Sequence, residues 1–212
     1  MKDLEINSIL GANEWFIGAD EEQVMDTLTT QPVLSGLVQV IIEEDLKDSE
    51  EYAKDVFYSL FGTILRAYSE NLGNSYKEVS EEDIDAAFEK QNKFAELLSE
   101  TLGVDIDKEG ENDEAISNDL MEKLANLETK FSEDENFDLE KEGLGGLGEL
   151  IGKINEETKQ PSLNAFLQSE LEEADLDEQT TGFINQQFVI IIDAIETMVD
   201  RTHGEDAKMK IV

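Results

Sequence analysis

Closely spaced carboxylates are the residues most able to do chemistry in this chain. The run from Asp105 to Asp113 spaces them like the start of a calcium-binding loop, with oxygen donors at loop positions 1, 3, 5 and 9 and glycine at position 6. The match then fails, because position 8 is Asn112 instead of an apolar anchor and position 12 is Ile116 instead of a bidentate carboxylate. We interpret the run as a solvated acidic loop, with a weak cation site as the alternative, and expect no resident metal.

A second pattern, Gly143-Leu-Gly145-Gly-Leu-Gly148, satisfies the glycine spacing of a dinucleotide-binding turn. That turn needs a hydrophobic strand before it, whereas the residues before Gly143 are the charged run Asp138–Glu142. The same carboxylates would repel a pyrophosphate. We therefore expect a hinge, or a helix start that another helix approaches closely, and no bound nucleotide or other cofactor.

The chain has a single histidine, His203, three residues after Asp200. A catalytic triad would also need a nucleophile in a recognisable turn, and none is present. A di-iron bundle needs two Glu-x-x-His elements, which one histidine cannot supply. We expect His203 to interact with the C-terminus of a helix, and Trp15 to fill the core instead of forming a sugar platform. These patterns predict a protein that is not an enzyme.

The net charge is the strongest property of the sequence. There are 52 acidic against 16 basic residues, for a formal charge of −36. Residues 1–106 carry 24 acids and 7 bases, and residues 107–212 carry 28 acids and 9 bases, so the charge is not confined to one end of the chain. The densest segment is 105–142, with 15 acids and 4 bases. Such a surface disfavours direct binding to nucleic acid or to an anionic membrane, and it attracts basic proteins in a salt-dependent way.

Composition also bounds the compartment and the redox chemistry. Cysteine is absent, which excludes disulfides and thiolate chemistry. The N-terminal residues MKDLEINSIL show no apolar signal segment, and the longest apolar run, Phe188–Ile192, has five residues. We expect a cytoplasmic location.

Helical periodicity dominates the chain and predicts an all-α fold, an irregular bundle of about seven or eight helices in one domain over residues 1–212. A candidate subdomain boundary lies at 103–113, and acidic loops are expected at 104–112 and 132–142. The segments expected to be helical are 20–30, 32–47, 49–73, 80–103, 116–131, 144–158, a helix beginning at Pro161, and 177–203.

Two of these segments carry more specific expectations. The stretch 33–42 is rich in β-branched residues, so a strand is the alternative to a buried helix there. On a helical wheel, the last segment separates an apolar seam from a polar sector that includes Asp193 and Glu196. Gln187 falls in the apolar sector, and we expect it to be a buried, hydrogen-bonded amide.

The charge and the lack of catalytic motifs together indicate a binding protein that occupies a basic surface on a partner protein. Two forms are equally compatible: a nucleic-acid mimic that inhibits a nucleic-acid-binding protein, and an immunity-type neutraliser of a basic toxin. The alternative is a structural or assembly protein, such as a scaffold or chaperone-like subunit, that associates through apolar helix faces; the oligomeric state is left open. The residues expected to contact the partner are Asp105, Asp107, Glu109, Asp113, Glu133, Asp134 and Asp138.

Overall fold

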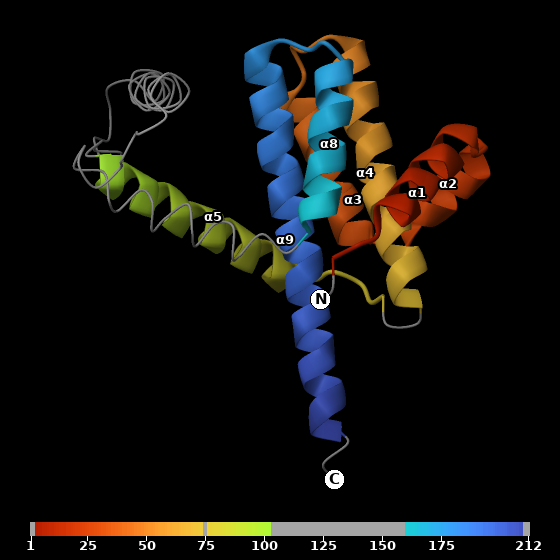
Figure 1. Ribbon diagram of the computed structural model, residues 1–212, viewed down its shortest axis with the longest axis vertical. Coiled ribbons are helices and arrows are strands. Elements are labelled where there is room, and N and C mark those ends of the chain that lie inside the picture. The colour runs from red at the N-terminus through yellow and green to blue at the C-terminus, as the bar shows by residue number, and fades with distance from the viewer. Residues whose placement is uncertain (1–2, 74–75, 103–159, 210–212) are drawn as a thin grey trace, which may run out of the picture. The chain divides into compact units, whose positions relative to one another are not determined.

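The computed structural model describes residues 3–73, 76–102 and 160–209 (Figure 1). Within these ranges the chain forms seven helices and contains no strand, which confirms the all-α fold. The helices expected at 116–131 and 144–158, both acidic loops and the candidate boundary at 103–113 lie outside the described residues.

Contacts along the chain divide it into two compact units. The first joins residues 1–88 to 159–212, and the second is the intervening stretch 89–158. Helix α5 (Glu81–Leu102) begins in the first unit and contributes the described part of the second.

The N-terminal part of this unit consists of short helices. Helix α1 (Ile6–Gly18), which the periodicity of the sequence did not predict, buries Ile9, Ala12 and Phe16 along one side. Helix α2 (Glu21–Thr29) begins as expected, because Asp20 and Gln23 form a reciprocal capping box.

The β-branched stretch 33–42 is helical, so the strand alternative is wrong. Helix α3 (Pro32–Val40) has Pro32 in its first turn and continues into a π-helical segment, Ile41–Asp45, which the sequence did not predict. The two together span the expected 32–47 segment to within two residues. Three apolar residues on one side of the segment, Leu34, Val38 and Ile41, enter the core.

Helix α4 (Glu51–Leu72) is the centre of the unit. It contacts α1, α2, α8 (Pro161–Glu173) and α9 (Glu178–Met209), and it packs most extensively against α1. Figure 1 shows α4, α8 and the first half of α9 side by side. The aromatic rings of Phe57 on α4 and Phe188 on α9 stack with centroids 5.0 Å apart, which joins the two helices at the core.

Helix ends follow local rules that the sequence displays. Gly73 ends α4 with a φ of 51°, a conformation that glycine adopts without strain. Ser80 and Asp83 cap α5 reciprocally, with Ser80 N–H to Asp83 Oδ2 at 2.9 Å and Asp83 N–H to Ser80 Oγ at 3.3 Å. Asp175, between α8 and α9, takes a left-handed φ of 52°.

Helix α9 extends six residues beyond the expected end at 203. Position 203 therefore lies more than a turn before the helix terminus, but the side chain of His203 lies outside what the structure describes, so its expected interaction stays a prediction. The predicted apolar seam is confirmed, since Ile184, Phe188, Ile191, Ile195 and Met198 are all buried. By length and composition Glu178–Thr202 could also cross a membrane, but a core helix passes the same test, and 56% of its most apolar window is buried here.

The burial of two polar residues of α9 differs from the helical-wheel prediction. Glu196, placed in the polar sector, is fully buried, while Gln187, expected to be buried, is only half-buried. Glu196 Oε1 accepts hydrogen bonds from Tyr68 Oη at 2.9 Å and from Gln160 Nε2 at 2.7 Å. Gln160 in turn accepts one from Leu4 N–H at 2.7 Å, so this buried network ties the N-terminal segment to α4 and α9.

Candidate functional site: an acidic groove between two helices

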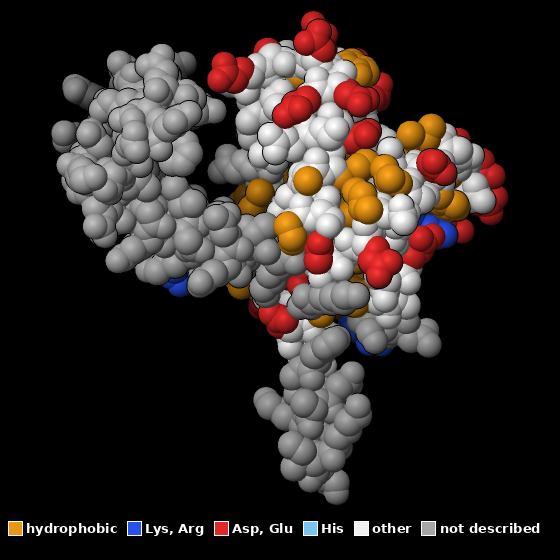
Figure 2. Space-filling view, viewed as in Figure 1, with side chains coloured by type: hydrophobic (Ala, Val, Ile, Leu, Met, Phe, Trp, Pro, Cys, Tyr) orange, Lys and Arg blue, Asp and Glu red, His pale blue; other side chains and the backbone are white. Residues whose placement is uncertain are grey.

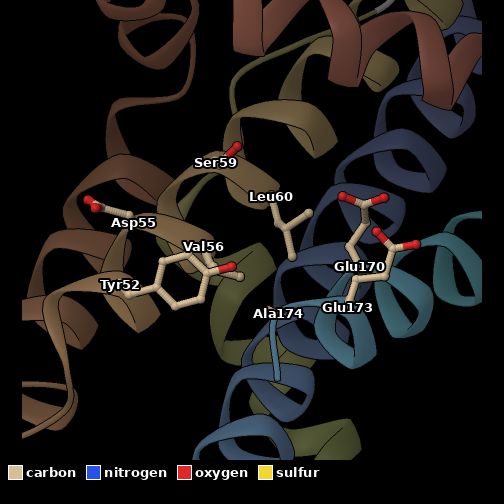
Figure 3. A pocket seen from close by; sticks show the side chains of 8 residues that line it. All are labelled: Tyr52, Asp55, Val56, Ser59, Leu60, Glu170, Glu173 and Ala174. Atoms are coloured by element: carbon tan, nitrogen blue, oxygen red, sulfur yellow. The ribbon is translucent and has the colours of Figure 1, made fainter. Parts of the chain in front are cut away.

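A groove of about 350 Å³ lies between the first half of α4 and the C-terminal end of α8 (Figure 3). It is shallow and open, and each helix supplies one wall. The residues that line it are Tyr52, Asp55, Val56, Ser59, Leu60, Glu170, Glu173 and Ala174.

The α4 wall is mostly apolar. Leu60 is buried, Val56 is half-buried, and the ring of Tyr52 is 53% exposed at the rim. These residues recur at four-residue spacing, which places them on one side of the helix. Figure 3 shows Asp55 extending from this wall away from α8. The wall therefore offers an apolar strip that ends in an exposed aromatic ring.

The α8 wall carries two carboxylates. Glu170 and Glu173 lie one helical turn apart, and Figure 3 shows their carboxylates side by side at the C-terminal end of α8, where both residues line the groove. Burial raises the pKa of Glu170 above its ordinary value, and the neighbouring Glu173 charge raises it further. A positive charge in the groove would favour the ionised carboxylate and so offset both increases in the pKa of Glu170.

Glu170 interacts with Asn13 of α1. The Asn13 amide donates a hydrogen bond to its carboxylate, which lowers the Glu170 pKa and offsets part of the rise. Asn13 Oδ1 accepts in turn from Thr63 Oγ1 of α4 at 3.1 Å. Asn13 therefore lies between Thr63 of α4 and Glu170 of α8.

The groove lies within a larger acidic end of the unit. We use that name for the carboxylates at the start of α4 and at the α8–α9 junction: Asp48, Glu50, Glu51, Asp55, Glu170, Glu172, Glu173, Asp175, Asp177 and Glu178. All are exposed except the half-buried Glu170. The one base in these two stretches, Lys54, is paired to Glu51 with Nζ 3.4 Å from Oε2. Figure 2 shows acidic side chains over this end.

The groove sets two carboxylates beside an apolar strip and an exposed aromatic residue. Its lining contains no histidine and no base beside Ser59 that could activate the hydroxyl. Within the described ranges no three acidic or histidine side chains converge to hold a metal ion, which agrees with the outward direction of Asp55. Carboxylates opposite an aromatic ring suit an organic cation.

The structure leaves the predicted contact residues untested. Asp105, Asp107, Glu109, Asp113, Glu133, Asp134 and Asp138 all lie outside the described residues. Sequence reasoning passed over the groove although a signal was present. Residues 170–178 hold six acids in nine, more than the five in 105–113. What the sequence lacked was the pairing of α8 with α4, 110 residues away along the chain.

Trp15 also differs from its expected role. Trp15 is half-buried, and Cζ of the Arg66 guanidinium lies over its ring, 4.2 Å from the ring centroid. Arg66 also pairs with Glu70 at 2.7 Å. The residue that fills the core at this point is the neighbouring Phe16, which contacts Gly62 of α4.

No protein-family model, curated protein or solved structure matches the chain.

Proposed function

We propose that this chain is a non-enzymatic binding protein that covers a basic surface of a partner protein with its acidic end. The observation that carries the proposal is the acidic end itself, with ten carboxylates against one paired lysine, beside a groove whose apolar wall can receive a side chain. Complementary charge of this kind speeds encounter and selects the partner.

The position of these charges supports a role in binding over a role in folding. Glu170, Glu172 and Glu173 occupy the last turn of α8, where no basic residue offsets them. The C-terminus of a helix carries a partial negative charge, so carboxylates there are unfavourable. Charges that cost stability yet face a groove are what a binding surface requires.

The proposal is tested by capture on the immobilised full chain at low salt, followed by identification of the retained proteins. We expect proteins with strongly basic surfaces that elute as salt rises. If nothing basic is retained, or if retention ignores salt, the proposal is wrong. Competition then separates its two forms, because duplex DNA or RNA displaces a partner that normally binds nucleic acid and leaves a basic toxin in place.

A second candidate function, assembly into a larger particle, is favoured by the exposed face of α1. Ile6, Leu10 and Ile17 lie within about 40° of one another on the helix and are 46%, 44% and 72% exposed. Light scattering at high salt, where repulsion between copies is screened, tests this alternative. Discrete oligomers that Leu10→Lys disperses would favour assembly, and a monomer at all salt concentrations would contradict it.

A further inference from the structure

We propose that the groove between α4 and α8 binds one arginine side chain of the partner, with its guanidinium against Glu170 and Glu173 and its stem along Val56, Leu60 and the Tyr52 ring. This inference rests on the proposed function and specifies its central contact. Its occupant is defined by what the two walls offer.

Charge and shape together select a basic side chain. One wall presents two adjacent carboxylates and the other an apolar strip, so a ligand needs a cation joined to an apolar stem. Lysine and arginine both meet this requirement. The groove is too open to enclose a free small molecule, but it can receive a side chain that a partner's surface holds in place.

Two features favour arginine over lysine. The exposed Tyr52 ring at the rim offers a face on which a planar guanidinium can stack. Opposite it, two carboxylates one turn apart can accept several N–H donors from one fork, whereas an ammonium acts as a point charge.

The test measures binding of short fluorescent peptides to the full chain at low salt. One Gly–Ser peptide carries three arginines, a second carries three lysines, and a third carries three citrullines, which keep the arginine shape without its charge. We expect the arginine peptide to bind most tightly and the citrulline peptide not to bind.

The decisive comparison pairs two double variants of equal charge. Glu170→Gln/Glu173→Gln removes both groove carboxylates, and Glu22→Gln/Asp26→Asn removes two exposed carboxylates of α2, which does not line the groove. We expect the groove variant to weaken arginine-peptide binding about tenfold or more, since both lost groups are direct acceptors, and the control to weaken it about threefold or less through screened charge alone. Circular dichroism verifies that both variants remain folded.

Tyr52 supplies the second comparison. Tyr52→Leu should reduce arginine-peptide binding about two- to fivefold more than lysine-peptide binding, whereas Tyr52→Phe should retain the preference for arginine. Equal losses in the two double variants, or a groove variant that still prefers arginine, would overturn the inference. The proposed function would survive that result if the chain still captured basic proteins in a salt-dependent way. If the chain captured no basic proteins, the proposed function itself would be wrong.

Discussion

At the scale of single residues, Phe16 packs closely against Gly62. A Cβ atom added at Gly62 would lie 1.9 Å from Phe16 Cε2, so Gly62→Ala must displace a buried ring. We expect a loss of about 1–3 kcal/mol in the free energy of unfolding, measured by urea denaturation, despite the better helix propensity of alanine. Gly11→Ala on α1 is the matched control, because nothing lies within 4 Å there, and it should stabilise by up to about 1 kcal/mol.

A double variant checks the cause of that loss. In a Phe16→Ala background the ring is gone, so Gly62→Ala should become neutral or stabilising. If the loss persists there, the clash is not its origin.

Asp83 makes a second residue-scale prediction, which concerns pH. Burial raises its pKa, but hydrogen bonds from Arg201 and Ser80 outweigh burial, so the pKa of this carboxyl lies below its usual range. The Arg201 fork contacts both oxygens, with Nε at 3.1 Å and Nη2 at 2.7 Å. Because the folded pKa is depressed, the stabilisation is complete above the unfolded value near 3.9 and is lost as pH falls through the folded pKa.

We therefore expect Asp83→Asn to cost about 1–3 kcal/mol at pH 7 and progressively less below about pH 4. Urea denaturation of the unmodified chain and of Asp83→Asn at each pH from 7 to 2.5 gives the difference between their free energies of unfolding. The corresponding substitution of an exposed carboxylate on α2, Asp26→Asn, should show no such convergence. A gap that stays constant with pH would contradict the assignment.

The residue scale also marks what a sequence can reveal. Ser80 and Asp83 are three residues apart, so the cap was visible, but the Arg201 partner of Asp83 lies 118 residues away. Glu196 was placed on a solvated face for the same reason: only the fold brings Tyr68 and Gln160 to it. Local pairs follow from spacing, whereas long-range polar partners require the packing.

At the scale of elements, the last turn of α8 and the first turn of α9 offer opposite helix ends five residues apart. Glu173→Lys places a positive charge at a C-terminus and should stabilise by about 0.3–1 kcal/mol at low salt. Glu178→Lys makes the same charge change at the N-terminus of a helix, where an acidic residue is favourable, and should lower the free energy of unfolding by a similar amount.

Comparison of these two variants removes the general effect of lowering the net charge. Urea unfolding at low salt should give them opposite signs, and high salt should bring them together. Two equal gains would show that global repulsion dominates the dipole. Glu173→Lys should also weaken binding to basic partners, which would expose the conflict between stability and function at this turn.

Most element boundaries were predictable because caps and stops are local. Asp20, Pro32, Gly73 and Pro161 each mark a helix end within a residue of its place. Helix α1 was missed because its apolar residues spread over a broad arc instead of one narrow stripe, with Ile9, Ala12 and Phe16 in the core and Ile6, Leu10 and Ile17 exposed. The π-helical segment carries no local signal. The groove arises from the meeting of two predicted helices, and no periodicity within either one specifies that meeting.

At the scale of the whole molecule, salt should act on folding and on binding in opposite directions. A charge of −36 repels itself in the compact state, and raising ionic strength from 0.01 to 0.15 M shortens the Debye length from about 30 to about 8 Å. We expect the urea midpoint to rise over this range; a gain of about 1 kcal/mol corresponds to a shift of about 0.3–1 M. Over the same range the affinity for basic partners should fall.

The dependence of the urea midpoint on salt at higher ionic strength distinguishes an acidic surface that serves binding from one that serves solvation. Screening of repulsion is nearly complete by about 0.15–1 M, so stability should level off there if the charge serves binding. Measurement near pH 4, where about half the carboxylates are protonated, provides the control, because the salt effect should shrink with the charge. A midpoint that keeps rising into molar salt while binding stays unchanged would instead mean that the acidic surface serves solvation.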